Sequence, residues 1–237
     1  MNTQGQKVAI ITGASQGIGA GIVAAYRQLG YGVVATSRSI AASQDPDVVT
    51  VRGDISDPAT AERVIAAGIE RFGRIDTLIN NAGVFISKPF TEFTQEDYDT
   101  ALGVNMAGFF RISQLAVARM LEQGGGHIVQ ITTSLVDQPS SKVPSVLASL
   151  TKGGLQSATK ALAIEYAASG IRSNAVALGT IKTPMHDEQH HEALAAMHPV
   201  GRMGDVSDIV DAVLYLENAP FVTGSILHVD GGQNAGH

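Results

Sequence analysis

The stretch Thr12–Gly19, Thr-Gly-Ala-Ser-Gln-Gly-Ile-Gly, constrains the fold of this chain more than any other. The apolar run before it, residues 8–11, predicts a buried strand, and the apolar positions from Ile22 to Leu29 recur with the period of a helix. A helix N-terminus presents free N–H groups and the positive end of its dipole to an anion. A glycine-rich turn between a strand and a helix therefore predicts a phosphate cradle here.

The three glycines of this turn have different expected roles. Gly13 permits the tight turn, Gly17 lets the backbone approach a pyrophosphate, and Gly19 lets the helix pack closely on the strand. Their spacing is Gly-x3-Gly-x-Gly, whereas the usual dinucleotide fingerprint is Gly-x-Gly-x-x-Gly. The glycines alone are also compatible with a purely structural turn. The flanking strand and helix favour the nucleotide interpretation.

Composition excludes several classes of protein. A net charge of −6 argues against a general nucleic-acid or membrane-surface role, and the absence of cysteine removes disulfides, thiolate nucleophiles and cysteine-based metal sites. No apolar run approaches the ~18 residues of a membrane span. Residues 1–7 are polar and lack the apolar core of a signal peptide. We expect one soluble, cytoplasmic domain over residues 1–237.

Strand and helix patterns alternate along the rest of the chain. After the first strand, strands are expected at residues 32–36, 48–51, 75–79, 127–131, 172–177 and 225–229. Helices are expected at residues 57–72, 95–121, 145–168 and 205–217, while 39–47 leaves room only for a short helix and 181–199 shows no sheet pattern. Such alternation predicts an α/β fold with a parallel sheet of about seven strands and helices on both faces.

Several further motifs occur in a fixed order after the glycine turn. They are Asp54-Ile55, Asn80-Asn81-Ala82-Gly83, Asn105, Thr132-Thr133-Ser134, Lys152, Gly201-Arg202-Met203-Gly204 and Asp230-Gly231-Gly232. With these motifs the chain resembles the short-chain dehydrogenase/reductase family over nearly its whole length. The resemblance implies a single doubly wound Rossmann-type domain, a nicotinamide dinucleotide cofactor and a homotetramer.

The expected cofactor site lies at the carboxyl edge of the sheet, where doubly wound folds bind ligands. Small residues after the fourth strand leave room for the adenosine half, and the Asp54 carboxylate can accept a hydrogen bond from the adenine amino group. The resemblance adds contacts with the nicotinamide end. The predicted cofactor-binding residues are Gly13, Ser15, Gln16, Gly17, Ile18, Gly19, Ser37, Arg38, Asp54, Ile55, Asn81, Ala82, Gly83, Lys152, Gly179, Ile181 and Thr183.

The end of the second strand bears on the choice of dinucleotide. An NAD site usually places Asp or Glu there, about 20 residues past the glycines, to hold the ribose 2′-hydroxyl. This chain has Ser37-Arg38, and a guanidinium can bind a 2′-phosphate through two parallel hydrogen bonds. Gln16 stands where many NADP-using relatives carry a basic residue. We expect NADP(H) as the preferred cofactor, with NAD(H) as the second candidate.

The catalytic pattern departs from that of the family at one position. The family pattern is Asn, Ser, Tyr and Lys, with the tyrosine one helical turn before the lysine. There the phenol exchanges the substrate proton, and the lysine lowers the phenol pKa from about 10. In this chain Ala148 stands four residues before Lys152, and a methyl group transfers no proton. Lys152 also binds the nicotinamide ribose in the family. We expect space above Ala148 where a ring would otherwise stand.

Two hydroxyls compete for the position of the family's serine. Aligning the strand without gaps selects Thr133, while counting back from Lys152 selects Ser134. Either could donate a hydrogen bond to a substrate carbonyl. Asn105 is expected in the middle of a helix, where Asn is unfavourable without a further reason, and in the family it holds a water of the proton relay. The catalytic candidates are Asn105, Thr133, Ser134 and Lys152.

Residues 181–200 form the expected substrate lid. They carry His186, His190, His191 and His198. His186 and His190 have metal-ligand spacing, but no carboxylate or thiol pattern completes a site, so no metal is predicted. A lid helix in solvent is one interpretation of the histidines. The other is a proton donor, because imidazolium has a pKa near 6.5.

Two functions remain open from the sequence. The first is an NADP(H)-dependent oxidoreductase that transfers hydride between the nicotinamide and a small carbonyl or alcohol, with an atypical proton donor. The second is a catalytically weak or inactive NADP(H)-binding protein, either a cofactor sensor or a subunit of an assembly. The helices at 95–121 and 145–168 carry apolar residues on more than one face, which favours a homotetramer. No nucleic acid or membrane partner is expected.

Overall fold

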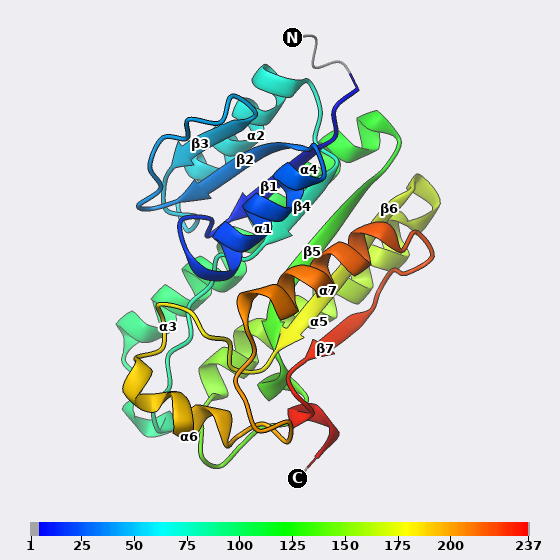
Figure 1. Ribbon diagram of the computed structural model, residues 1–237. Helices are drawn as coiled ribbons and strands as arrows, with labels where there is room; N and C mark the ends of the chain where they lie inside the picture. Colours follow the sequence, from blue (N-terminus) through cyan, green and yellow to red (C-terminus); the bar gives the residue numbers. More distant parts are fainter. Residues whose placement is uncertain (1–4, 237) are drawn as a thin grey trace.

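Seven parallel strands make the central layer of the computed structural model, which describes residues 5–236. The strands are β1 Val8–Thr12, β2 Gly32–Ser37, β3 Val48–Arg52, β4 Thr77–Asn80, β5 Gly126–Thr133, β6 Ile171–Leu178 and β7 Ile226–Val229. Their spatial order is β3-β2-β1-β4-β5-β6-β7 (Figure 1). The chain adds strands toward one side as far as β3 and then, from β4 on, toward the other side of β1. The predicted doubly wound, Rossmann-type sheet is confirmed.

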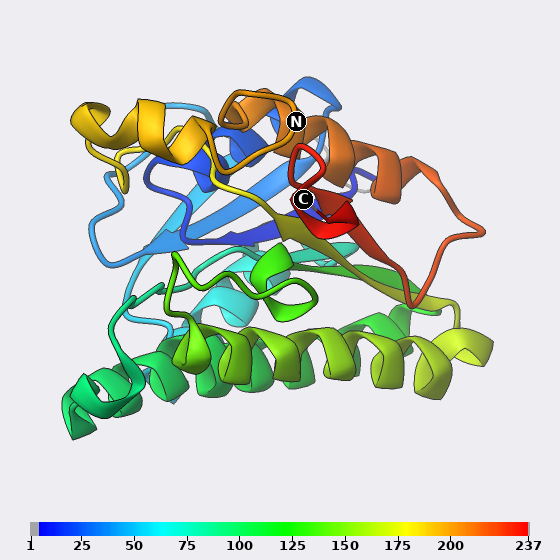
Figure 2. The same ribbon diagram turned by 90° about the horizontal axis from the view of Figure 1, so that it is seen from below.

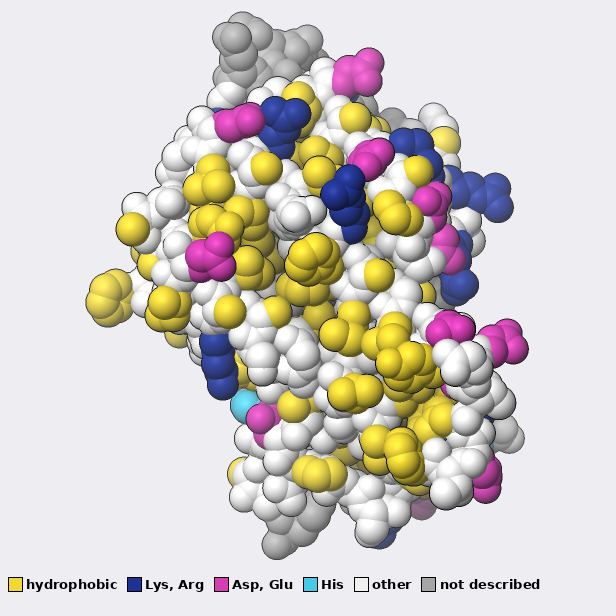
Figure 3. All heavy atoms as spheres, turned by 180° about the vertical axis from the view of Figure 1, so that it is seen from behind, with side chains coloured by type: hydrophobic (Ala, Val, Ile, Leu, Met, Phe, Trp, Pro, Cys, Tyr) yellow, Lys and Arg dark blue, Asp and Glu magenta, His cyan; other side chains and the backbone are white. Residues whose placement is uncertain are grey.

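Helices cover both faces of the sheet, as Figure 2 shows edge-on. One face carries α1 Gly17–Gln28 and α7 Val206–Asn218, and the other carries α2 Pro58–Phe72, α4 Phe109–Gln123 and α5 Val146–Tyr166. Each face has its own apolar core, because alternate residues of a strand point to opposite sides. Hydrophobic side chains also gather on the outer face that includes α4 and α5 (Figure 3).

The ends of α2 follow the local signals in the sequence. The Asp57 carboxylate accepts a hydrogen bond from the Ala59 N–H at 3.0 Å, and Pro58 occupies the first helical position. Gly73 ends the helix with a φ of 77°, a left-handed conformation that favours glycine. Residues 39–47 form turns and contain no helix, in keeping with the short connection expected there.

The expected helix at 95–121 is interrupted in its middle. α3 Gln95–Ala101 runs into a π-helical segment, Leu102–Gly108, before α4 begins. The π-helical segment contains Asn105, whose side chain is buried and bonds to neighbouring segments. Sequence periodicity could not reveal the interruption, because a single wide turn barely disturbs the apolar pattern. Such segments occur frequently at functional sites.

The same helical stretch, Gln95–Gln123, is the one segment within residues 5–236 that is long and apolar enough to cross a membrane. The expectation that no run approaches a membrane span is therefore too strong as a statement about composition. Within this segment Ile112, Ala116 and Met120 are fully buried against the sheet. Their packing is that of a core helix in a folded domain.

Residues 181–200 form irregular and short helical structure, as expected. The backbone pairs Lys182 N–H with the Gly204 carbonyl at 2.8 Å and then enters α6, His191–Ala195. In Figure 1 this segment lies at the end of the molecule toward which the strand arrows point. It therefore stands beside the carboxyl edge of the sheet.

Candidate active site

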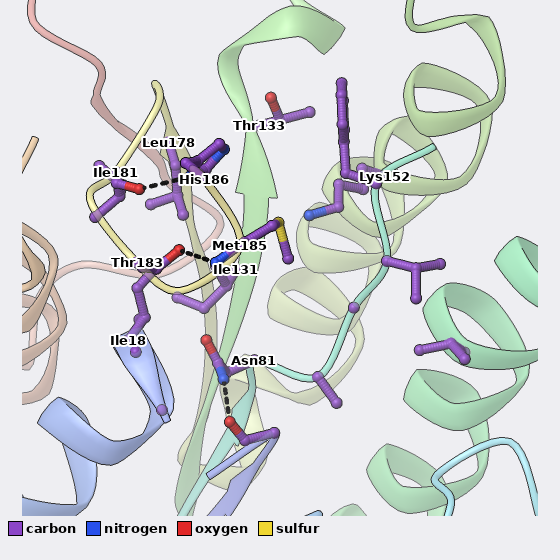
Figure 4. Close-up of a pocket in the computed structure, with 18 of the residues that line it drawn as sticks. Ile18, Asn81, Ile131, Thr133, Lys152, Leu178, Ile181, Thr183, Met185 and His186 are labelled. Carbon is purple, nitrogen blue, oxygen red and sulfur yellow. Dashed lines mark hydrogen bonds between the residues drawn. The ribbon is translucent and has the colours of Figure 1, made fainter. Parts of the chain in front are cut away.

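A cavity of about 930 Å3 opens at the carboxyl edge of the sheet. The glycine turn after β1 and the ends of β2 and β3 line one part of it. Residues 81–87, the end of β5, Lys152 of α5 and the segment 178–186 line the other. Figure 4 shows this second part, with Lys152 and Thr133 across the space from the segment 178–186. The volume suits an extended ligand.

The glycine turn is packed too tightly for side chains. Gly13 has a φ of 66°, and a Cβ there would lie 2.9 Å from the Ala82 Cα. A Cβ on Gly19 would collide with the Gly13 carbonyl oxygen. Gly17 has a φ of 53°, and a Cβ there would lie 3.2 Å from the Thr183 side chain. The turn therefore presents backbone toward the cavity, as an anion cradle requires.

The Asn81 side chain braces this turn. Its Nδ2 donates to the carbonyl oxygens of Thr12 at 2.9 Å and Gly13 at 3.1 Å. Thr12 Oγ1 accepts hydrogen bonds from the N–H groups of Asn81 and Ala82 at 3.0 and 2.9 Å. Thr12 was absent from the predicted set, although its place in the glycine motif was a usable signal. The end of β1 and the loop after β4 are thus locked together.

The residues expected around the adenosine half also line the cavity. Arg38 follows β2 and is exposed. Asp54 Oδ1 accepts hydrogen bonds from Ser56 N–H at 3.0 Å and Ser56 Oγ at 2.8 Å. The backbone bond from Ser56 is the main cause that lowers the pKa of Asp54, and the positive charge of Arg38 adds to it. A carboxylate and a guanidinium therefore face this end of the cavity together.

The structure separates the two hydroxyls after β5. Thr133 lines the cavity, and its Oγ1 accepts a 3.3 Å hydrogen bond from Leu135 N–H, which leaves the hydroxyl hydrogen available. Ser134 is fully buried and is not among the lining residues. Its hydroxyl lies 3.0 Å from both the Leu178 carbonyl and Gln233 Oε1. Of the two hydroxyls, only that of Thr133 lies at the cavity with Lys152.

Asn105 is a brace between two lining segments. Its Oδ1 accepts from Val84 N–H at 2.9 Å, and its Nδ2 donates to the Val84 carbonyl and Thr151 Oγ1, both at 3.1 Å. Asn105 is 2% exposed and does not line the cavity. Protein groups thus occupy both the oxygen and the nitrogen of the side-chain amide. Asn105 holds the loop after β4 against α5.

Lys152 points from α5 into the cavity (Figure 4). Its Nζ lies 3.7 Å from the place where a Cβ of Gly83 would stand. Among residues 5–236 the ammonium has no hydrogen-bond or ion-pair partner. Burial lowers the pKa of Lys152 to about 8. The residue therefore offers a positive charge to a ligand.

Ala148 is buried, and the expected space above it is missing. The side chain is 2% exposed and does not line the cavity. Ser149, the next residue of α5, lies with its Oγ 3.3 Å from the Leu135 carbonyl and 3.3 Å from Ser145 Oγ. These contacts hold the segment after β5 down on the start of α5. No tyrosine is among the described residues that line the cavity.

The turn after β6 is fixed by a histidine. A Cβ on Gly179 would lie 2.6 Å from His198 Nε2, so only glycine fits. His198 Nε2 accepts from Thr180 N–H at 2.9 Å, while Nδ1 donates to the Leu194 carbonyl at 2.9 Å. The imidazole thereby ties the expected lid to the Gly179 turn. The sequence indicated His198 only as part of the lid and gave no sign of this role.

The other lid histidines differ in their access to the cavity. His186 lines it, together with Ile181 and Thr183. His190 and His191 do not, and His191 Nε2 lies 3.2 Å from the His186 carbonyl. No group of three or more His, Asp or Glu side chains within residues 5–236 could hold a metal ion.

Comparison with known proteins supplies the class. The family model described as Enoyl-(Acyl carrier protein) reductase matches residues 13–234. Its match covers the glycine turn, both lining segments of the cavity and the C-terminal motif. The chain belongs to the short-chain dehydrogenase/reductase family, a family of oxidoreductases.

Relatives match over almost the whole chain. L-xylulose reductase of Bos taurus is 35% identical over 94% of this chain and 95% of its own length. The structure described as ElxO with NADP bound has a TM-score of 0.90 and 28% identity, covering 98% of this chain and 100% of its own. The 3-ketoacyl-(acyl-carrier-protein) reductase of Brucella melitensis complexed with NADH has a TM-score of 0.90 and 30% identity, covering 96% and 98%.

Proposed function

We propose that this protein is an NADP(H)-dependent oxidoreductase acting on a small carbonyl or alcohol substrate. One observation carries the proposal. A single cavity is lined by the anion cradle at Gly13–Gly19 and also by Thr133 and Lys152. A cofactor that lies along the cradle would bring its far end to a hydroxyl donor and a positive charge.

The residues present fit such a dinucleotide. The cradle consists of backbone that a Cβ would obstruct, which suits a pyrophosphate. Arg38 would hold a 2′-phosphate, and Asp54 would accept from the adenine amino group. Gly179, Ile181 and Thr183 would meet the nicotinamide end. NADP(H) is the preferred form in this proposal, because no carboxylate follows β2 directly, and NAD(H) is the weaker alternative.

The bound nicotinamide would supply the hydride, and the chain would position the substrate. Thr133 would donate its free hydroxyl hydrogen to the carbonyl oxygen. The Lys152 ammonium would hold the nicotinamide ribose and stabilise negative charge as it develops on that oxygen. Asn105 would keep the loop after β4 in register with α5. Ser134, bonded inside the fold, has no part in this chemistry.

The second candidate function is a dinucleotide-binding protein with weak or no turnover. The observation in its favour is Ala148, which stands four residues before Lys152, where the family has tyrosine, and leaves no phenol at the cavity. Both candidates bind the cofactor, so binding alone does not distinguish them. Turnover does.

The experiment is a paired measurement on the same preparation. Titration of NADPH and NADH by fluorescence gives both affinities. NADPH oxidation is then followed with ethyl acetoacetate, diacetyl and L-xylulose, which represent a β-ketoester, an α-diketone and a pentulose. Tight NADPH binding with turnover supports the oxidoreductase. Tight binding without turnover of any probe selects the sensor, and absence of dinucleotide binding overturns both.

We also propose a homotetramer in the cytoplasm as the working form. Figure 3 shows hydrophobic side chains gathered on the face that includes α4 and α5. Exposed hydrophobic residues of these two helices include Phe110, Leu150 and Ile164, which is 83% exposed. An apolar surface of this kind is costly on a lone domain. Light scattering should report four chains, and Ile164→Glu should shift the mass downward. A wild-type monomer at micromolar concentration would contradict the proposal.

A further inference from the structure

The lining residues restrict which group exchanges the substrate proton. Arg38 and Asp54 stand at the adenosine end of the cavity. At the other end the titratable lining residues are Lys142, Lys152 and His186, within the described part of the chain. Lys142 is exposed on the segment before α5. Burial brings the pKa of Lys152 to about 8, so its ammonium also titrates near neutral pH, but its proposed place is on the nicotinamide ribose. The imidazole of His186 is the remaining lining group with an ordinary pKa close to neutral pH.

The hydrogen bonds of His186 fix its tautomer. Nδ1 lies 2.9 Å from the Ile181 carbonyl oxygen, which can only accept a hydrogen bond. Nδ1 therefore carries a hydrogen, and in the neutral ring Nε2 has a free lone pair. Within residues 5–236 no protein group bonds to Nε2. Figure 4 shows the ring with Nδ1 turned to Ile181 and its other nitrogen turned toward the interior of the cavity.

The backbone places this ring beside the nicotinamide end. His186 N–H donates to the Thr183 carbonyl at 3.0 Å, which closes a turn over residues 183–186. Thr183 packs against Gly17, and Ile181 lines the cavity. The bond from Nδ1 to Ile181 thus couples the ring to the two residues assigned to the carboxamide. A shift of the ring would require a shift of that contact.

We infer that His186 is the acid–base catalyst of this enzyme, in the role left vacant by the tyrosine; the inference rests on the proposed oxidoreductase function. In reduction the carbonyl carbon receives a hydride, the π electrons move to oxygen, and oxygen takes the proton from Nε2. The ring becomes neutral and is reprotonated from water. In oxidation the neutral Nε2 removes the hydroxyl proton as hydride leaves the carbon. Each direction conserves atoms and charge.

The charges around the ring determine the pH dependence. His191 on α6 approaches from the lid, Asp187 is the next residue along, and Lys152 and Lys142 line the cavity opposite. Burial lowers the pKa of His186 below 6.5, and His191 adds to this effect. The rate of reduction should fall as pH rises through that value, because the protonated ring is required. The rate of oxidation should rise through the same value.

The test compares His186→Asn with His190→Asn. The amide introduced by the first substitution can still donate to the Ile181 carbonyl but exchanges no proton, and His190 lies in the same lid away from the cavity. We expect the kcat of His186→Asn to fall by about 10²–10⁴ with an unchanged NADPH affinity. The limb of the pH profile below pH 6.5 should disappear, while a limb near pH 8 from Lys152 remains. His190→Asn should behave as wild type. Added imidazole should restore part of the rate to His186→Ala.

The remaining outcomes contradict either the assignment of His186 or the proposed oxidoreductase function. An unchanged kcat in His186→Asn, or a fall that retains the pH limb and resists imidazole rescue, would overturn the assignment. Nitrogen-15 NMR of the ring in the free protein tests it without turnover: we expect the Nδ1–H tautomer, and an Nε2–H tautomer would overturn it. Absence of turnover in the wild type with all three probes would instead remove the oxidoreductase function.

Discussion

The polar side chains at the carboxyl edge and at the amino edge of the sheet differ in whether they are hydrogen-bonded within the protein. At the carboxyl edge, Lys152 Nζ and His186 Nε2 face a cavity without a protein partner among the described residues. At the amino edge lies a cluster in which side chains bond to one another. We call it the amino-edge cluster, and its members are Tyr26, Tyr31, Thr77, His127, Asn174 and Glu217.

The amino-edge cluster is centred on one buried carboxylate. Glu217 accepts hydrogen bonds from Tyr26 at 3.0 Å, Tyr31 at 2.9 Å, Thr77 at 3.1 Å and His127 at 3.0 Å. Burial opposes ionisation, but the hydrogen bonds, led by the one from His127, outweigh it and hold the pKa of Glu217 at about 2. The carboxylate joins the end of α7 to α1, β4 and β5.

The state of His127 follows from its neighbour. Ser225 N–H donates to Asn174 Oδ1 at 3.0 Å, so the Asn174 amide nitrogen faces His127 Nε2, at 3.1 Å. Nε2 is then an acceptor, Nδ1–H donates to Glu217, and the ring is neutral. Burial lowers the pKa of His127 in the same sense. His127 has both nitrogens bonded, whereas His186 has one, and on this difference we assign a part in catalysis to His186 and not to His127.

The largest expected effect comes from a substitution at the carboxyl edge. Lys152→Met removes the charge that we propose to face the substrate oxygen, and it keeps a side chain of similar length. We expect kcat to fall by about 10²–10³, in line with the loss of one preorganised donor at a developing oxyanion. The melting temperature should change little, since the ammonium bonds no described protein group. A stable variant with wild-type kcat would show that the charge of Lys152 at the carboxyl edge has no part in catalysis.

The next effect concerns the amino-edge cluster and should appear in the free energy of unfolding. Glu217→Gln replaces the acceptor of four hydrogen bonds by an amide that brings its own donor. Bonds to a charged acceptor contribute roughly 1.5–3 kcal/mol each, and the bonds that the amide still accepts limit the net loss to about 3 kcal/mol. Urea unfolding measures it, with the exposed Glu122→Gln as control. Activity of the folded fraction should be retained.

The pH dependence of unfolding separates the two edges further. The folded-state pKa of Glu217, about 2, lies below the ordinary value of 4.5. Its contribution is therefore complete above the unfolded-state value and disappears as pH falls from about 4.5 toward 2. The stability difference between wild type and Glu217→Gln should shrink over that interval. A constant difference would mean that ionisation of Glu217 is not what stabilises the cluster.

Arg38→Asp should produce a smaller change, confined to cofactor choice. The substitution removes a charge-assisted contact with a 2′-phosphate and supplies an acceptor for a 2′-hydroxyl. We expect NADPH to bind about 10–100-fold more weakly, because bonds to charged groups contribute roughly 1.5–3 kcal/mol, while NADH binds more tightly. Arg119→Asp, on the outer surface of α4, is the charge-matched control. Equal wild-type affinities for both nucleotides would refute the role of Arg38.

The sequence predicted which segments meet at the cavity on the carboxyl edge, for a physical reason. Glycine positions and strand ends are local, and sheet topology then brings them to one edge. Residues whose roles depend on side-chain direction were not predictable. Thr133 and Ser134 are adjacent, yet β5 turns one to the cavity and the other into the fold. The four lid histidines could likewise not be told apart from the sequence. The amino-edge cluster left no signal, since its members are scattered from Tyr26 to Glu217.

The smallest predicted effect concerns a third histidine, at the carboxyl edge. It tests whether a histidine with both ring nitrogens hydrogen-bonded has a structural role there, as His127 has at the amino edge. His198 lies beside the cavity, but Thr180 N–H and the Leu194 carbonyl occupy both its nitrogens. His198→Ala leaves Thr180 N–H without its acceptor, a loss of about 1 kcal/mol, so NADPH should bind roughly five-fold more weakly. The pH limb of kcat should remain, since His186 is untouched. If the limb vanished in His198→Ala and persisted in His186→Asn, the free-nitrogen criterion would have selected the wrong ring.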